Sequence, residues 1–336
     1  MTGTPRYWLV LQPDLKHPSG GVKQMHRLAE TITSAQREAI LIQDDASFHP
    51  GWFRSNVRSI NFSAWQERND LDPARDVVIL PETFIHDVFS YGPTLPKVIF
   101  NQNTAYSFGP IDDNYLERPS GIFEIYRHPS IKQVLCVSEY DHEVLTSCFG
   151  FPSEKVSIIR NAVETDLFKP IGVKKRQLCF MPRKNPRDST LLMEILKEHD
   201  WFQGWTTIAI TDLPQQKVAN LMSESLLFLS FGHPEGFGLP VAEAMACGCA
   251  VVGYSGLGGR ELFRIGKQFQ VATEIAYGDF VQFVSSMQDL DRRIQNDIGL
   301  LQHQLQAAAA AIREHYGPEA MQRSVTGALT HIEANL

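Results

Sequence analysis

The sequence has 336 residues, of which 43% are hydrophobic and 21% are charged. This length and composition predict about two folded domains rather than a disordered chain. Lysine and arginine number 31 against 38 acidic residues, a formal charge of −7, which argues against a general attraction to nucleic acid. The five cysteines contain no CxxC pair, so neither a disulfide framework nor a zinc ribbon is expected. No apolar run reaches the roughly 18 residues of a membrane span, and a cytoplasmic protein is expected.

Short apolar runs alternate with amphipathic stretches in the first half of the chain. The predicted strands lie at 7–11, 39–42, 76–80, 97–100, 133–137 and 156–159, and the predicted helices at 22–36 and from 138 to about 150. The turn Ser19-Gly20-Gly21 separates the first strand from the first helix. This alternation is typical of β-α-β units with parallel strands and right-handed crossovers.

A stretch without periodicity, 165–176, interrupts this pattern and is interpreted as a linker; it ends in the basic cluster Lys174-Lys175-Arg176. The alternation then resumes, with predicted strands at 178–181, 206–210, 226–230 and 249–253 and predicted helices at 189–198, 215–223 and 240–247. The tail is helical from about 290, breaks at Gly317-Pro318 and ends in an amphipathic stretch, 319–333. Two doubly wound α/β halves are therefore predicted.

The densest feature of the sequence is the glycine-rich segment 232–248, which follows the predicted strand 226–230. Pro240 suits the first turn of a helix, and Gly248 suits the residue just past its end. Gly236 and Gly238 carry no side chains, so a ligand can approach backbone N–H groups at the positive end of that helix. The segment predicts an anion site, most naturally for a diphosphate.

Two carboxylates flank this predicted anion site. Glu235 lies in the loop and Glu243 lies one turn into the helix, so the two do not share a helix face. A phosphate would repel both of them. Hydroxyl groups of a sugar and of a ribose are their expected partners, since carboxylates accept hydrogen bonds from hydroxyls strongly.

The stretch Glu235-Gly-Phe-Gly-Leu-Pro-Val-Ala-Glu-Ala-Met-Ala-Cys-Gly-Cys-Ala-Val-Val252 resembles the signature of retaining family 4 glycosyltransferases with the GT-B fold. The segments 19–22, 137–156 and 161–170 match that family in the same order. The resemblance is close from about 134 to 263 and weak over most of 40–130. It implies two Rossmann-like, doubly wound parallel-sheet domains that face a central cleft. The acceptor domain would be 1–167, the donor domain 168–317, and the helix in 318–336 would cross back to the N-terminal domain.

The resemblance also implies roles for individual residues. Glu235 would contact the donor sugar near its reacting carbon, and Arg183 would neutralise the leaving diphosphate. The family's usual lysine, five positions after that arginine, is Asp188 here, so Lys184 or Arg187 is expected to supply the second cation, and we assign Lys184 to the catalytic set. The donor-binding residues would be Gly20, Gly21, Gly236, Phe237, Gly238, Leu239 and, at the ribose, Glu243.

A second departure concerns a histidine that the family often carries after a strand in the middle of its N-terminal domain. Here the strand is followed by Asn101-Gln102-Asn103. An amide orients a hydroxyl but is not a general base. Gln102 and Asn103 are therefore candidates for contacts with the acceptor or the sugar, and the alternative is that they cap a turn. The departing phosphate oxygen would then take the proton of the acceptor. No metal or other cofactor is expected, and Asp112-Asp113 is interpreted as a solvated loop.

Three neighbours of the predicted site have simpler interpretations. Cys247 and Cys249 are predicted to be small buried packing residues rather than a redox or metal pair. The run Gly256-Leu-Gly-Gly259 either closes around phosphate or only turns the chain. A structural role in the loop is favoured for His233 over ligand binding.

The function implied by the resemblance is that of a retaining hexosyltransferase in glycan biosynthesis. It would move a sugar from a nucleotide-diphosphate sugar to a glycan, lipid-linked or small-molecule acceptor. A lipid-linked acceptor is compatible with peripheral contact at the inner face of the membrane. Two alternatives stay open: a catalytically silent nucleotide-sugar-binding protein, and a nucleotide-sugar epimerase or hydrolase of the same fold.

Overall fold

The computed structural model describes residues 4–11, 13–16, 18–108 and 121–336; the pair Asp112-Asp113 lies outside the described residues. Contacts divide the chain into two compact units: unit 1 is Met1–Ala162 with Glu319–Leu336, and unit 2 is Val163–Pro318. From the sequence we expected the first boundary between residues 167 and 168; the contacts place it between 162 and 163.

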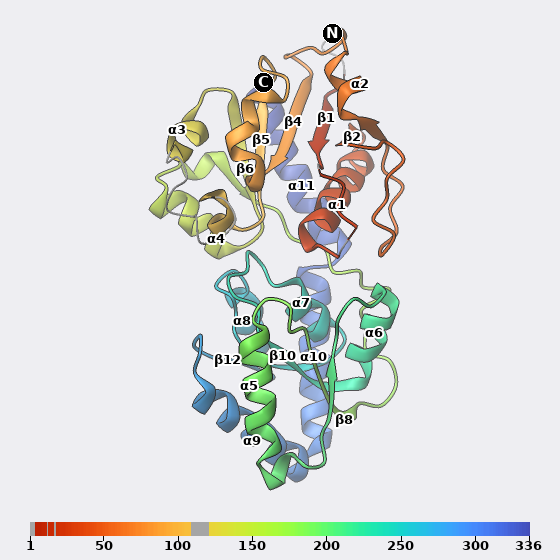
Figure 1. Cartoon of the computed structure of the whole chain (residues 1–336), viewed down its shortest axis with the longest axis vertical. Coiled ribbons are helices and arrows are strands. Elements are labelled where there is room, and N and C mark those ends of the chain that lie inside the picture. Colours follow the sequence, from red (N-terminus) through yellow and green to blue (C-terminus); the bar gives the residue numbers. More distant parts are fainter. Residues whose placement is uncertain (1–3, 12, 17, 109–120) are drawn as a thin grey trace. The chain divides into compact units, whose positions relative to one another are not determined.

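Unit 1 contains a seven-stranded sheet in the order β3-β2-β1-β4-β5-β6-β7, and every pairing of neighbouring strands in it is parallel. The strand order reverses between β1 and β4, as in Rossmann-like sheets. Its elements, drawn in Figure 1, are β1 (Arg6–Val10), α1 (Gly20–Ser34), β2 (Glu38–Gln43), β3 (Ser59–Asn61), α2 (Phe62–Gln66), β4 (Asp76–Pro81), η1 (Glu82–Ser90), β5 (Lys97–Asn101), η2 (Thr104–Phe108), α3 (Ile122–Arg127), β6 (Ile131–Cys136), α4 (Glu139–Glu143), η4 (Val144–Cys148), η5 (Ser153–Lys155), β7 (Val156–Ile158) and α11 (Pro318–Glu333).

Burial explains why the central strands of unit 1 read as apolar runs. Both faces of a parallel sheet are covered, so its strands need apolar side chains on both sides. All five residues of β1 are buried, and β1 pairs with β2 and β4. Helix α1 buries Met25, Leu28 and Ile32, which recur at helical spacing.

The last helix of the chain belongs to unit 1. In Figure 1 the blue helix α11 lies among the red and orange elements of that unit. The Glu333 carboxylate accepts hydrogen bonds from the Tyr7 hydroxyl (3.0 Å) and the Arg37 guanidinium (2.9 Å). The Ser324 hydroxyl accepts one from the backbone N–H of Arg160 (3.0 Å). The last helix of the chain is thus hydrogen-bonded to residues of the N-terminal part of unit 1.

Unit 2 contains a five-stranded sheet in the order β12-β11-β10-β8-β9, with all neighbouring strands parallel. This is the flavodoxin-like order, in which the winding reverses between β8 and β10. Its elements are β8 (Lys175–Phe180), α5 (Pro186–Lys197), η6 (Asp200–Phe202), β9 (Thr206–Ala209), α6 (Gln215–Glu224), β10 (Ser225–Ser230), α7 (Leu239–Ala246), β11 (Ala250–Gly253), α8 (Arg260–Gln268), β12 (Ala272–Glu274), α9 (Phe280–Asn296) and α10 (Ile298–His315).

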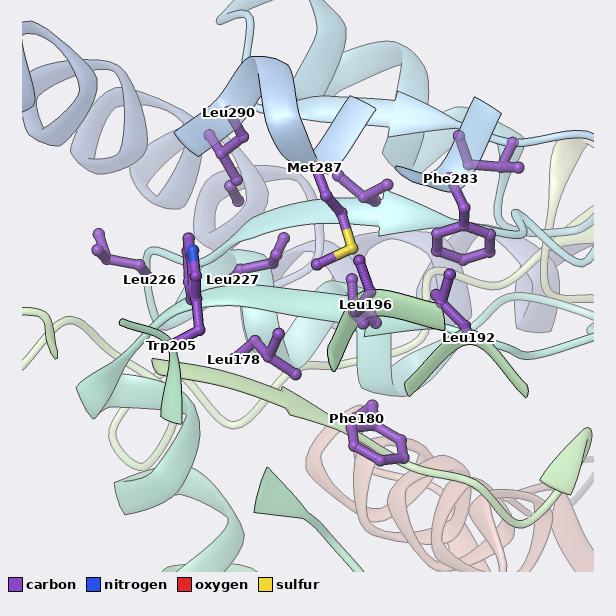
Figure 2. Packing of buried hydrophobic residues seen from close by; sticks show 14 of the residues in the cluster. Leu178, Phe180, Leu192, Leu196, Trp205, Leu226, Leu227, Phe283, Met287 and Leu290 are labelled. Carbon is purple, nitrogen blue, oxygen red and sulfur yellow. The ribbon is translucent and has the colours of Figure 1, made fainter. Parts of the chain in front are cut away.

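A single apolar core holds the strands of unit 2 against helices α5 and α9. Figure 2 shows Leu192 and Leu196 of α5 close to Phe283 and Met287 of α9, with strand residues such as Leu227 beside them. All of these side chains are at most 1% exposed. Dense packing of this kind fixes the strand ends, and therefore the loops that leave them.

The structure corrects the interpretation of 165–176 as a simple linker. Lys175 and Arg176 begin β8, and their cations are paired with Glu224 (2.6 Å) and Asp291 (2.5 Å). Lys174 donates to the carbonyl of Cys247 (2.7 Å). The basic cluster therefore contributes to the packing of unit 2, because each of its three cations has a partner within that unit.

The helical tail was expected from about residue 290, but helix α9 already begins at Phe280. Several other elements that the sequence pattern missed are short. Strands β3 and β12 have three residues each, and helices α2 and α3 have five and six. Runs this short are too brief to show a period. Helix α8, with nine residues, was also missed, although its buried Leu262 and Phe263 lie on a face opposite charged residues.

Candidate functional site

The loops that leave β8 and β10 meet where the winding of unit 2 reverses. Ligands of open α/β sheets bind at this point, outside the carboxyl ends of the strands. The β8 loop carries Arg183 and Lys184, and the β10 loop carries Glu235. A pocket is present here, and residues of both loops line it together with the start of α7: Met181, Arg183, Lys184, Phe228, Ser230, Phe231, Gly232, Glu235, Gly238, Pro240, Val241 and Ser255.

The β10 loop turns sharply into α7. Gly238 is the N-cap residue and has a φ of 86°, a left-handed conformation that glycine adopts without strain. Pro240 lies in the first turn, and Gly248 follows the last turn with a φ of 78°. The predicted strand, glycine turn and helix are all present here, with Pro240 and Gly248 at the two predicted ends.

The start of α7 presents backbone donors. Within the described part of the chain, the N–H groups of Gly236, Phe237 and Gly238 donate no hydrogen bond to another protein group. A helix N-terminus also carries the positive end of the helix dipole. These N–H groups and the dipole together suit an anion such as a phosphate.

The structure brings Lys184 to Glu235. The Lys184 ammonium lies 3.2 Å from Glu235 Oε2 and donates to the carbonyl of Pro234 (2.5 Å). The side chains are 18% and 22% exposed, so the pair lies at the protein surface yet is partly sheltered. Arg183 is exposed on the same loop and lines the pocket. Two cations and one carboxylate are therefore available to a ligand bound here.

The position at which the resemblance would place a lysine holds an aspartate with a structural contact. Asp188, in the first turn of α5, accepts a hydrogen bond from the Tyr254 hydroxyl (2.8 Å). Burial and this acidic partner raise the pKa of Tyr254 well above its usual value. The second cation near Glu235 is thus at position 184, four residues earlier than the pattern would place it.

The remaining donor-site predictions fall on or next to α7. Glu243 lies on the helix and is only 8% exposed. The Phe237 side chain is buried and packs on Tyr316, with ring centroids 5.0 Å apart. The part of Phe237 available to a ligand is therefore its backbone. Leu239 is the first residue of α7 and is half-buried.

The turn Gly256-Leu-Gly-Gly259 supports the Glu235 loop, a role that the sequence pattern did not reveal. The Glu235 N–H donates to the carbonyl of Gly256 (2.8 Å), and the Gly258 N–H donates to the carbonyl of Glu235 (3.0 Å). A Cβ on Gly256 would lie 2.5 Å from the Glu235 Cβ, and one on Gly258 would overlap the carbonyl of Gly236. Only glycines allow the two loops to approach this closely.

His233 and the cysteine pair have structural partners. The His233 ring stacks on Tyr277 with centroids 4.4 Å apart, and burial lowers the pKa of His233. Cys247 and Cys249 are at most 1% exposed and form no disulfide. Among the described residues, no group of three or more His, Cys, Asp or Glu side chains is suited to hold a metal ion.

Four predicted residues belong to unit 1. Gly20 and Gly21 begin α1, and the Gln102 side-chain amide donates to the carbonyl of Gly21 (3.3 Å). Asn103 is buried, and its Oδ1 accepts the N–H of Ala105 (3.1 Å). The structure thus joins Gln102 to the first glycine turn, and Asn103 directly precedes the short helix η2 and accepts the N–H of its second residue.

Comparison with known proteins agrees with this architecture. Residues 206–296 match the family model described as Glycosyl transferases group 1. The matched residues extend from the start of β9 to the end of α9. An alpha-1,6-glucosyltransferase from Actinobacillus pleuropneumoniae serotype 7 (strain AP76) is 27% identical over 190 residues, which is 54% of this chain and 54% of that protein. The matched residues include the β10 loop and α7 but not Arg183 and Lys184 of the β8 loop.

Solved structures extend the likeness to both units. Sucrose-phosphate synthase from Thermosynechococcus elongatus has a TM-score of 0.72 at 12% identity and covers 99% of this chain and 100% of its own. HepE from Anabaena in complex with UDP-glucose has a TM-score of 0.68 at 14% identity, with 97% and 99% covered. The chain therefore has the GT-B fold. Among its described helices, none has the length and apolar composition needed to cross a membrane.

Proposed function

We propose that this protein is a retaining glycosyltransferase that uses a nucleotide-diphosphate sugar as donor and needs no metal. A single observation carries the proposal. The uncommitted N–H groups of Gly236–Gly238 lie at a helix N-terminus, beside the cations of the β8 loop and the Glu235 carboxylate. Donors for a phosphate and an acceptor for a sugar hydroxyl are what a nucleotide-diphosphate sugar requires.

The neighbours support a choice of donor for the first experiments. HepE was solved with UDP-glucose, and the curated relative bears the name of a glucosyltransferase. The chain spans about half the length of that relative, 54%. We therefore take UDP-glucose as the first donor to test, with Glu235 at the sugar hydroxyls and Glu243 at the ribose.

The proposed mechanism follows the charges. The bond between the anomeric carbon and the β-phosphate oxygen breaks, and its electron pair leaves with the diphosphate. The acceptor hydroxyl oxygen bonds to the anomeric carbon on the same face, and its proton passes to the departing phosphate oxygen. Arg183, Lys184 and the N-terminus of α7 stabilise the negative charge as fixed electrostatic partners.

Lys184 also links the two halves of this reaction. Its ammonium is 3.2 Å from Glu235, the residue that we assign to the sugar hydroxyls. It also lines the same pocket as Arg183 and Gly238, which we assign to the phosphate. The ammonium would stabilise the negative charge on the leaving group and hold the Glu235 carboxylate, whose negative charge favours the positive charge that develops on the sugar. We assign the acceptor, a glycan, a lipid-linked sugar or a small molecule, to unit 1, and the reaction to the cytoplasm or the inner face of the membrane.

The first test is calorimetric titration of the full chain with UDP, GDP, ADP and dTDP, without added metal. We expect one nucleotide to bind, and UDP before the others. Hydrolysis of the matching nucleotide sugar is then measured in the wild type and in Glu235→Gln. An enzyme loses turnover in this variant and keeps its affinity for the nucleotide, since the amide still fits but carries no charge.

Two results would reject the proposal in different ways. If well-folded protein binds none of the four nucleotides, with or without magnesium, the start of α7 is not a donor site. If a nucleotide binds but neither hydrolysis nor transfer is found, the chain is a silent nucleotide-sugar-binding protein. Asp188 in place of a lysine is the observation that keeps this alternative worth testing.

A further inference from the structure

The reversal point of the unit 1 sheet holds a second set of polar side chains. Its winding reverses between β1 and β4, so ligands of this unit are expected at the carboxyl ends of these strands. Glu82 follows β4 directly, and the Gly20-Gly21 turn lies between β1 and the body of α1. Gln102 follows the next strand, β5, and donates to Gly21. The predicted acceptor contacts and Glu82 therefore share one edge.

Two buried carboxyl groups hold the segment that follows β5. Glu82 Oε2 accepts the backbone N–H of Gln102 (2.9 Å). Asp141 Oδ1 accepts both the N–H (3.2 Å) and the hydroxyl (2.9 Å) of Thr104. The two carboxyl groups come from the neighbouring loops on either side, after β4 and after β6, and are 3% and 1% exposed. They fasten the backbone on both sides of Asn103.

The two ends of the Gln102 side-chain amide have different surroundings. The side-chain nitrogen of Gln102, Nε2, donates a hydrogen bond to the Gly21 carbonyl. This bond identifies the other end of the amide as the oxygen, Oε1. Among the described residues, no group donates to Gln102 Oε1. An amide oxygen accepts hydrogen bonds only. Its matching ligand is a hydroxyl donor, as in a sugar.

We propose that Glu82 is a positioning residue which, with Asp141, fixes the backbone from Gln102 to Thr104 so that Gln102 Oε1 receives a hydroxyl of the acceptor. The inference rests on the proposed glycosyltransferase function, which it extends to the acceptor side. Glu82 itself is buried and acts through the Gln102 backbone, so it does not touch the substrate. A carboxyl group is costly to bury, and the geometry gives it a task that an apolar residue could not perform.

The charge state of Glu82 gives this role a signature. Burial, with a contribution from the negative charge of Asp141 on α4, raises the pKa of Glu82 to about 8. Tyr126 on α3 also interacts with Glu82, and its own pKa is raised by burial and stays above the working range. Near pH 7 Glu82 is therefore protonated. Above pH 8 a second buried negative charge appears beside Asp141 and strains the segment.

The test compares three variants of the full chain: Glu82→Ala, Glu82→Gln and the control Gln133→Ala. Gln133 is also buried in the unit 1 sheet, but its amide bonds to Ser157 and Glu154 and not to the segment after β5. The first readout is amide hydrogen exchange at Gln102 and Thr104. We expect the protection factor of the Gln102 N–H, which is its exchange rate relative to the intrinsic rate at the same pH, to fall about tenfold in Glu82→Ala and to be unchanged in the other two variants. Above pH 8 it should fall in the wild type but not in Glu82→Gln.

The second readout is transfer from UDP-glucose to methyl glucoside, beside hydrolysis of UDP-glucose by water. We expect Glu82→Ala to lower kcat/KM for the acceptor about tenfold and to leave hydrolysis within twofold of the wild type. Glu82→Gln should keep transfer and lose its decline above pH 8. Equal losses in Glu82→Ala and Gln133→Ala, or a retained decline in Glu82→Gln, would overturn the positioning role.

The two proposals fail separately. If the wild type neither hydrolyses UDP-glucose nor transfers glucose, the proposed function fails for this donor, while the exchange rates still decide whether Glu82 holds Gln102. If transfer occurs but exchange at Gln102 is the same in all variants, the glycosyltransferase stands and the positioning role is wrong.

Discussion

The carboxyl edges of the two sheets are built by different means. In unit 2 the site is made of backbone N–H groups at the start of α7, with three charged side chains beside them. In unit 1 the corresponding edge is made of an amide, Gln102, in a segment held by two buried carboxyl groups: Glu82 binds the backbone of Gln102, and Asp141 binds Thr104. A backbone site needs glycines at fixed spacing and therefore leaves a strong sequence signature. A side-chain network can be built from residues far apart in the chain, and it leaves almost none.

The largest expected effect concerns the charge at the unit 2 edge. Glu235→Gln keeps the size of the side chain and removes its negative charge. We expect kcat for donor hydrolysis and transfer to fall by about 10²–10³-fold, as for loss of one electrostatic contact to a transition state, while the Kd of the nucleotide changes little. Rapid-quench assays with calorimetry measure both. An unchanged kcat would remove Glu235 from the reaction.

The comparison between the edges is tested most directly with one substitution in each glycine turn. Gly258→Ala places a Cβ on the carbonyl of Gly236, whereas Gly21→Ala places one 3.5 Å from the Gln102 side chain, an ordinary contact. Overpacking costs about 1–3 kcal/mol, so the Kd of the nucleotide should weaken by up to about a hundredfold in Gly258→Ala. Calorimetry should give a change below about twofold in Gly21→Ala. Similar losses in both would contradict the contrast.

A smaller effect is expected within unit 2 from the removal of the second cation, Lys184. Lys184→Gln removes the ammonium that lies 3.2 Å from Glu235, and we expect kcat to fall by about tenfold to a hundredfold. The matched control is Asp188→Asn, which keeps an acceptor for the Tyr254 hydroxyl and should change kcat by less than about threefold. Steady-state assays decide. If Asp188→Asn has the larger effect, the site depends on α5 rather than on the β8 loop.

The smallest expected effect is on the stability of unit 1. The pKa of Glu82 is about 8 in the folded protein against an ordinary value of 4.5. Between these values the folded state binds a proton that the unfolded chain lacks, so the free energy of unfolding falls as the pH rises through this range. Glu82→Gln has no such proton to lose. Its Tm relative to the wild type should therefore rise from pH 5 to pH 8 by several °C, at about 2–4 °C per kcal/mol.

Calorimetric scans at pH 5, 6, 7, 8 and 9 measure this difference. It should level off above pH 8, where Glu82 is ionised in both the folded and the unfolded states. A Tm difference that stays constant over the whole series would show that Glu82 does not titrate in this range, and would remove the pH signature of the acceptor-side proposal.

Much of unit 2 could be predicted from the sequence. The run from Leu226 to Gly248 predicted a strand, a glycine turn and a helix in order, and the structure has all three. The reason is local: Gly238 needs a left-handed φ, Pro240 suits a first turn, and Gly248 ends the helix. A site that is built on one continuous turn can be predicted from the sequence, because residues adjacent in the sequence set its geometry.

Contacts between distant segments could not be predicted in the same way. The turn at Gly256-Gly259 braces Glu235 from another loop, and Lys184 reaches Glu235 across 51 positions of the chain, from 184 to 235. The short strands β3 and β12 exist because neighbouring strands offer them hydrogen bonds. In unit 1, nothing in the local pattern around Glu82 indicated that it would meet the Gln102 N–H.

The sequence by itself determined the order of strands and helices and the glycine turn that presents N–H groups to a phosphate, because both depend on residues a few positions apart. The tertiary structure alone decided which loops meet at the reversal points of the two sheets. In the folded chain Glu235 pairs with Lys184, and Asp188 binds Tyr254 instead. Glu82 and Asp141 are buried and accept hydrogen bonds from the backbone of Gln102 and Thr104. The packing of the sheets sets these encounters, since it fixes where each strand ends.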